Sequence, residues 1–95
     1  MLDKIRDEKT DKLAEAIACL KNPEEAYRFL GDICTISEIT EMSKRLLAAE
    51  MLRDGNTYND IAHSTRLSTA TITRVNRALR YGNDGYTMVL DRISK

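Results

Sequence analysis

The sequence is poor in the residues that build disulfide frameworks, metal sites and long loops. Its 95 residues include one proline, four glycines, two cysteines and one histidine. Two thiols without a C-x-x-C spacing make no disulfide framework, and one histidine cannot complete a metal site with them. We therefore expect Cys19 and Cys34 to be small core residues in a reducing compartment, and we expect no metal ion and no cofactor.

Long apolar runs and alternating patterns are also missing. No apolar run approaches the length of about 18 residues that a membrane span needs, and residues 1–12 are charged throughout. β-branched residues never alternate with polar ones over five or more positions, as they would in half-buried strands. The chain is therefore expected to be cytoplasmic and all-α, with no membrane partner.

The length and the apolar spacing predict one domain, over residues 1–95, of about six short helices joined by tight turns. A domain of this size buries only about 60–65% of its unfolded surface, so pairing with a second copy would add stability. The first helix is expected from near Leu2 to Leu20. Its second half is apolar nearly all round, which indicates burial on more than one side. The C-terminal helix is expected over residues 84–94.

Capping signals mark the ends of the second and third helices. Asn22 followed by Pro23 is typical of a helix start. Thr35 and Glu38 have the spacing of a capping box, in which each side chain bonds the backbone of the other residue. Gly55 is expected to supply the left-handed cap at the end of the third helix.

Charge is unevenly distributed along a chain whose formal net charge is zero. Residues 1–56 carry twelve acidic and nine basic side chains, whereas residues 57–95 carry three acidic and six basic ones. Because salt screens charges beyond about 8–10 Å, a phosphate backbone responds to the local excess. The basic C-terminal part therefore favours a nucleic-acid partner, although arginines can also simply solvate a helix face.

Residues 57–80 have the pattern of a helix-turn-helix. The positions at which two short helices must approach closely are apolar or small: Ile61, Ala62, Leu67, Ile72 and Val75. Thr57 and Ser68 are placed to cap the two helices. One departure is Arg66, which stands where the turn often has glycine because it favours positive φ.

The outward face of the second helix of this motif carries short side chains followed by arginines. The predicted DNA-contacting residues are Ser68, Thr69, Ala70, Thr71, Thr73, Arg74, Arg77 and, in the turn, Arg66. Short side chains let a helix start enter a major groove about 12 Å wide, and threonine can offer its hydroxyl to base edges and its methyl to thymine. Serine and threonine are also ordinary caps and surface residues. A segment so poor in helix formers is not favoured by propensity alone, however, which supports DNA readout.

The run from Ala70 to Arg74 (Ala-Thr-Ile-Thr-Arg), after Thr35, Glu38 and Arg45, resembles the Trp repressor superfamily. It is most similar to the Trp-repressor-related branch of YerC/YecD type, over roughly residues 34–79. The resemblance implies a six-helix subunit in an intertwined homodimer, with the N-terminal helices, residues 1–34, packed on the other chain. It also implies a sequence-specific transcriptional repressor that binds a two-fold-related operator in double-stranded DNA.

The resemblance implies a candidate effector site as well. In the tryptophan-sensing member two arginines flank the co-repressor and a threonine helps to hold its carboxylate, and Arg45, Arg74 and Thr35 occupy the matching positions. Val75 and Ala78 stand where that protein has glycine and serine, which crowds an indole and removes a polar contact. L-Tryptophan is therefore not the expected effector, and either another small carboxylate or no effector at all remains open.

Two other classes of function are alternatives to DNA binding. An enzyme is not expected, because His63 is the single histidine, neither cysteine has a base at a readable spacing, and no glycine-rich phosphate loop is present. A helical protein–protein interaction module without a DNA role would fit the zero net charge and the apolar first helix. It leaves the hydroxyl-then-arginine face of the residues after Ser68 unexplained.

Overall fold

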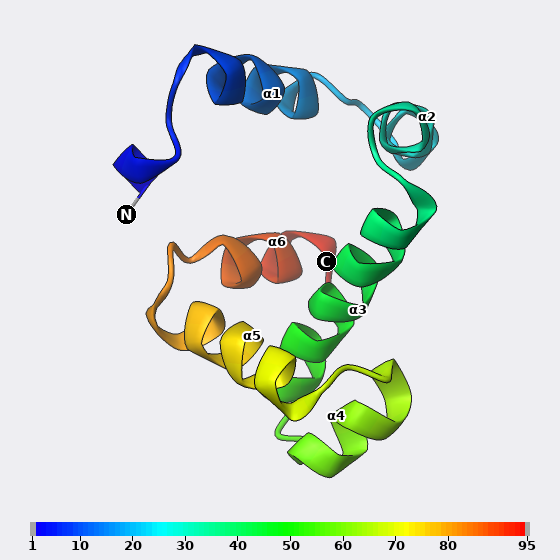
Figure 1. The fold of residues 1–95 in the computed structure, drawn as a ribbon, viewed down its shortest axis with the longest axis vertical. Helices are drawn as coiled ribbons and strands as arrows, with labels where there is room; N and C mark the ends of the chain where they lie inside the picture. The colour runs from blue at the N-terminus through cyan, green and yellow to red at the C-terminus, as the bar shows by residue number, and fades with distance from the viewer. Residues whose placement is uncertain (1, 95) are drawn as a thin grey trace. The chain divides into compact units, whose positions relative to one another are not determined.

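A computed structural model describes residues 2–94 of the chain, which form helices and no strands (Figure 1). The elements are a short 3-10 helix η1 (Leu2–Lys4) and the α-helices α1 (Glu8–Ala18), α2 (Pro23–Ile33), α3 (Ile36–Arg53), α4 (Tyr58–Thr65), α5 (Thr69–Tyr81) and α6 (Gly85–Ile93). The prediction of an all-α fold of about six short helices is confirmed. Within residues 2–94 no helix has both the length and the apolar character needed to cross a bilayer.

The chain divides into two compact units, Met1–Ile39 and Thr40–Lys95, here called the N-terminal unit and the C-terminal unit. The boundary falls inside α3, so the first turn of that helix belongs to the N-terminal unit. A single domain over residues 1–95 stays a prediction.

The first helix of the N-terminal unit begins later than the sequence pattern predicts. Asp7 caps α1 in a reciprocal arrangement: its carboxylate accepts a hydrogen bond from the Thr10 amide at 2.8 Å, and the Thr10 hydroxyl accepts one from the Asp7 amide at 2.8 Å. The predicted continuous helix from Leu2 to Leu20 is therefore wrong. A strong cap at Asp7 separates a one-turn 3-10 helix from α1, which ends at Ala18.

The caps of α2 and α3 agree with the sequence prediction. The Asn22 side chain accepts a hydrogen bond from the Glu25 amide at 2.9 Å, and Pro23 occupies the first helical position. At α3 the Thr35 hydroxyl accepts from the Glu38 amide at 3.1 Å, while the Glu38 carboxylate accepts from the Thr35 amide at 2.8 Å. The capping box is confirmed.

The N-terminal unit buries little of its apolar surface within one chain. Among residues 2–39 no side chain is classed as buried, and Leu13, Ile17 and Ile33 are 41%, 52% and 53% exposed. Burial of the second half of α1 on more than one side is therefore not found within the single chain. The prediction that both cysteines are core residues is also wrong: Cys19 is exposed just after α1, where its thiol donates to the Ala16 carbonyl, and Cys34 is only partly buried.

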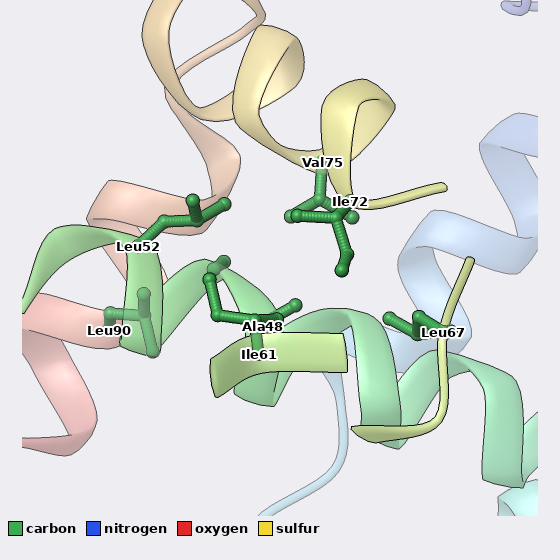
Figure 2. Packing of buried hydrophobic residues seen from close by; sticks show 8 residues of the cluster. Ala48, Leu52, Ile61, Leu67, Ile72, Val75 and Leu90 are labelled. Carbon is green, nitrogen blue, oxygen red and sulfur yellow. The ribbon is translucent and has the colours of Figure 1, made fainter. Parts of the chain in front are cut away.

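The core lies in the C-terminal unit, where α3, α4, α5 and α6 meet (Figure 2). Its buried apolar residues are Ala48, Ala49 and Leu52 of α3, Ile61 of α4, Leu67 of the following turn, Ile72 and Val75 of α5, and Leu90 of α6. The two alanines of α3 are fully buried, and their small size lets the helices of the motif, α4 and α5, approach α3 closely. This core fixes the orientation of α5, which contacts both α4 and α6.

Candidate nucleic-acid interface

The first helix of the motif, α4, is held at both ends by threonine hydroxyls. Thr57 caps its start by accepting a hydrogen bond from the Asp60 amide at 3.1 Å. Thr65, at its end, is buried, donates to the Ile61 carbonyl at 2.7 Å and accepts from the Leu67 amide at 3.2 Å. Since its hydroxyl is satisfied on both sides, Thr65 costs little when buried and ties the turn to α4.

The turn between the helices is left-handed at Arg66, which has a φ of 63°. The Arg66 amide donates to the Ala62 carbonyl at 2.8 Å, and this bond ends α4. Glycine is common at such a left-handed position, and this chain has arginine there instead. Arginine adopts the same conformation here and keeps its side chain exposed. Leu67 follows and points into the core, as predicted (Figure 2).

Ser68 sets the start of the second helix, α5. Its hydroxyl accepts a hydrogen bond from the Thr71 amide at 3.1 Å and donates to the Thr71 hydroxyl at 3.0 Å. Behind this start, Ile72 is fully buried and Val75 is 2% exposed against the core. The predicted anchoring of α5 through these two residues is confirmed, and the opposite face of the helix is consequently turned outward.

The predicted DNA-contacting side chains are almost all on this outward surface. Seven of them are exposed, namely Arg66, Ser68, Thr69, Ala70, Thr73, Arg74 and Arg77, and Thr71 is half-buried. Asp60 is the single acidic residue between Thr57 and Arg80, so the exposed surface is basic as well as rich in short side chains. The front of α5 is thus free within the subunit to meet a nucleic-acid groove.

One further pair on α5 was not selected from the sequence as a site. The Arg80 Nε donates to the Asn76 side-chain oxygen at 3.3 Å, and Asn76 is half-buried while Arg80 is exposed. Residues four positions apart share a helix face, so the spacing itself is the signal that could have indicated this pair. This hydrogen bond holds Arg80, the fourth arginine of the motif, on the exposed side of α5.

A cavity of about 390 Å³ adjoins the same helix and involves two of the three predicted effector residues. Its lining comes from α3, α5 and α6 and consists of Glu41, Arg45, Thr71, Arg74, Val75, Ala78 and Tyr86. Arg45 and Arg74 therefore come together, as the resemblance implies. Thr35 is not part of this lining, and its hydroxyl serves the capping box with Glu38.

Two side chains that line the cavity, Glu41 and Tyr86, are not among the site residues predicted from the sequence. Glu41 lies four residues before Arg45, a spacing that places both on one face of α3. The meeting of these residues with Tyr86 depends on how α6 packs, which no local pattern reveals. The cavity presents both signs of charge, because the Glu41 carboxylate and the guanidinium groups of Arg45 and Arg74 all line it.

Metal chemistry has no site in the described part of the chain. In residues 2–94 no group of three or more His, Cys, Asp or Glu side chains is placed to hold a metal ion. His63, the single histidine, is exposed on α4.

A helix-turn-helix with an anchored back, an exposed short-chain front and flanking arginines defines a helical DNA-binding regulator of transcription. The chain belongs to the Trp repressor protein family, whose sequence pattern matches residues 8–94. This is a family of DNA-binding regulators and not of enzymes.

Similar proteins support this assignment over nearly the whole chain. YerC, an uncharacterized protein of Bacillus subtilis (strain 168), is 52% identical over 94 residues, which cover 99% of this chain and 90% of YerC. The crystal structure of "a putative Trp repressor from Staphylococcus aureus" has a TM-score of 0.91 at 47% identity, covering 99% of this chain and 94% of that one. A TrpR-like protein from Eubacterium eligens ATCC 27750 has a TM-score of 0.90 at 50% identity, with 97% and 95% coverage. The resemblance to the YerC-type branch is confirmed.

Proposed function

We propose that the protein is a sequence-specific transcriptional repressor that binds a two-fold-related operator as a homodimer through its helix-turn-helix. The observation that carries this proposal is the geometry of α5. Its back is locked to the core by Ile72 and Val75, while Thr69, Ala70 and Thr73 stand exposed at its start. A rigid helix with small side chains at its leading end fits into a major groove, where base edges are distinguishable.

The charges of the motif support the same proposal. Arg66, Arg74, Arg77 and Arg80 are all exposed, on the turn and along α5, and guanidinium groups pair well with phosphate oxygens. In this proposal Arg77 contacts the DNA backbone and positions the helix, whereas Thr71 and Thr73 contribute to sequence preference. Since the DNA of a bacterial cell lies in the cytoplasm, the protein is expected to act there.

The homodimer is supported by the exposed apolar surface of the N-terminal unit. Helices of eleven residues, such as α1 and α2, are marginal in water unless an apolar face is covered. A second copy that covers Leu13, Ile17 and Ile33 would supply this burial and would place two reading helices about a two-fold axis. In helix-turn-helix dimers, of which the Trp repressor is itself a standard example, half-sites lie about 34–36 Å apart, and we adopt that spacing from the family.

The salt dependence of DNA binding tests the proposal against an interaction module without a DNA role. If the dimer neutralises about six phosphates, the logarithm of the association constant should fall with the logarithm of salt concentration with a slope of about −5. Fluorescence anisotropy on a duplex selected from random sequences, over a series of salt concentrations, gives this slope. A flat dependence, or no binding at low salt, would favour the interaction module.

Alanine variants separate base readout from backbone contact. Thr71→Ala and Thr73→Ala should reduce the preference for the selected duplex over a random one, whereas Arg77→Ala should weaken binding to both alike. Binding to the two duplexes is measured at one salt concentration for each variant. Equal losses on both duplexes for all three variants would contradict a reading role for α5.

A second proposal concerns the cavity that Arg45 and Arg74 share with Glu41. We propose that it can hold a small carboxylate effector, since guanidinium groups pair with carboxylates and Arg74 lies on the reading helix itself. Val75 narrows the space for an indole, so L-tryptophan is not the proposed ligand. A thermal shift series with amino acids and other small carboxylates, on the natural chain and on Arg45→Ala, tests this idea. If no carboxylate raises the melting temperature of the natural chain, the effector proposal fails.

A further inference from the structure

The centre of the outward face of α5 is a narrow stripe of three exposed residues. Ala70, Thr73 and Arg77 follow one another at spacings of three and four, so they lie above one another on one side of the helix. Successive residues turn by about 100°, which puts this stripe opposite the buried or partly buried Ile72, Val75 and Leu79. The first turns of the stripe therefore present two small side chains at the point of deepest entry into a groove.

The hydroxyl of Thr73 has already used its one proton inside the protein. It donates to the Thr69 carbonyl, four residues earlier, at 2.9 Å. A hydroxyl has one donor and two acceptor lone pairs, so the Thr73 oxygen can still accept a hydrogen bond but has no proton to give. The same bond holds the side chain in one rotamer, which fixes the position of its methyl group.

The hydroxyls of Ser68 and Thr71 are hydrogen-bonded to each other at the helix start, with Ser68 as the donor and Thr71 as the acceptor. Ser68 caps α5 and donates to the Thr71 hydroxyl, and Thr71 is half-buried beside the cavity. Neither residue belongs to the central stripe of Ala70, Thr73 and Arg77, so Thr71 would reach a base from the side of the reading face. Along the first turns of the central stripe, the side chains of Ala70 and Thr73 present methyl groups and one acceptor oxygen.

We propose that the methyl groups of Ala70 and Thr73 form a pair that recognises the 5-methyl group of thymine in each operator half-site. Thymine is the one base that carries a methyl group in the major groove, and alanine and threonine methyls are suitable contacts for it. The inference rests on the proposed DNA-binding function and adds which feature of the DNA is read and by which atoms.

The acceptor oxygen of Thr73 strengthens the preference for an A·T pair. The major-groove edge of that pair carries the thymine methyl and the adenine amino group, which is a hydrogen-bond donor. A side chain that combines a methyl with an acceptor-only oxygen matches both features. A G·C pair has the cytosine amino donor but no methyl, so it satisfies half of the arrangement.

The decisive experiment replaces thymine by deoxyuridine, one position at a time, in a duplex selected by the natural chain. This change removes the methyl and leaves every hydrogen-bonding group of the base in place. Fluorescence anisotropy at fixed salt should show about a fourfold loss of affinity for each contacted methyl, the effect expected for one buried methyl-sized group. The loss should be confined to one or two positions in each half-site.

Two substitutions at Thr73 assign the effect to its methyl group. Thr73→Ser keeps a hydroxyl for the Thr69 carbonyl and removes the methyl, so it should bind the thymine and deoxyuridine duplexes nearly equally at the affected position. Thr73→Val keeps a methyl and removes the hydroxyl, so its preference for thymine over deoxyuridine should persist. Thr40→Ser is the matched control, because it removes an exposed methyl group from α3, outside the motif, and should leave the preference unchanged.

The outcomes distinguish failure of thymine-methyl recognition from failure of the proposed DNA-binding function. Selective, salt-dependent binding in which every thymine tolerates deoxyuridine would overturn the methyl reading and leave the DNA-binding function standing. A Thr73→Ser variant with undiminished thymine preference would likewise overturn the assignment to Thr73. Absence of any sequence-selective binding would overturn both the inference and the proposed function.

Discussion

Arg66 determines the geometry of the motif, since it adopts the left-handed conformation between α4 and α5. Its side chain is exposed and its φ is 63°, a region that costs a non-glycine residue about 1 kcal/mol or more. A glycine would relieve that strain. An arginine in this place is therefore understandable if its charge serves DNA binding, because the fold alone favours glycine.

Replacing Arg66 by glycine should raise stability and lower DNA affinity together. We expect Arg66→Gly to raise the free energy of unfolding by up to about 1 kcal/mol and to weaken binding to selected and random duplexes alike. Denaturant unfolding and anisotropy titrations measure the two effects. Asp84→Gly is the matched control, because Asp84 has a φ of 66° outside the motif and should change stability alone. A less stable Arg66→Gly protein, or one with undiminished DNA affinity, would contradict the interpretation.

At the level of single helices, the termini are the features that local sequence determines best. The caps at Asn22, Thr35, Thr57 and Ser68 are predictable because each involves residues within three positions along the chain. The start of α1 is missed because Asp7 lies in a charged stretch where apolar spacing gives no boundary. The lining of the cavity by Glu41 and Tyr86 depends on packing between helices, so local patterns do not reveal it.

The capping box of α3 gives the stability of the chain a pH dependence. The backbone amide of Thr35, and then its hydroxyl, hold the pKa of Glu38 below its usual value of 4.5. Because the folded-state pKa lies below that of the unfolded chain, the contribution of Glu38 is full above the usual value and is lost as pH falls through the lowered one. Acidification therefore weakens the start of α3.

Glu38→Gln should flatten this dependence, since the amide keeps an acceptor oxygen and cannot be protonated in that range. Melting temperatures measured between about pH 6 and pH 3 should fall less for the variant than for the natural chain. Glu50→Gln, further along the same helix, is the matched control and should follow the natural curve. If Glu38→Gln and the natural chain lose stability in parallel as pH falls, the capping box does not contribute to the pH dependence of stability.

The end of α5 depends on the absence of a side chain at Gly82. A Cβ at this position would run into the backbone carbonyl of Ala78, to which the Gly82 amide donates at 2.9 Å. We expect Gly82→Ala to destabilise the fold by about 1–3 kcal/mol, because backbone must move to accept the added atom. Gly85→Ala is the control, since a Cβ there meets no atom within 4 Å. Thermal unfolding compares the two, and equal melting temperatures would contradict the predicted clash.

On the scale of the whole molecule, the buried core lies in the C-terminal unit, whereas exposed apolar side chains occur in both units. The C-terminal unit has a buried core that orients the reading helix, whereas residues 2–39 bury no side chain within one chain. Short helices with exposed leucine and isoleucine gain stability when a second copy covers them. The proposed homodimer therefore connects the stability of the N-terminal unit with the two-fold symmetry of an operator.

A charge placed on the exposed apolar face of α1 should separate dimer formation from the fold of the reading motif. Ile17→Glu introduces a carboxylate where Ile17 is 52% exposed in the single chain, and covering that charge in an interface costs several kcal/mol. We expect the dimer dissociation constant to rise by about a hundredfold or more, measured by sedimentation equilibrium. Operator affinity should fall with it, because one half-site supplies fewer contacts than two, while most of the helical circular dichroism signal of the chain persists. Lys12→Glu alters charge at an exposed position of the same helix and should leave the dimer intact. A dimer unaffected by Ile17→Glu would exclude this face of α1 from the interface.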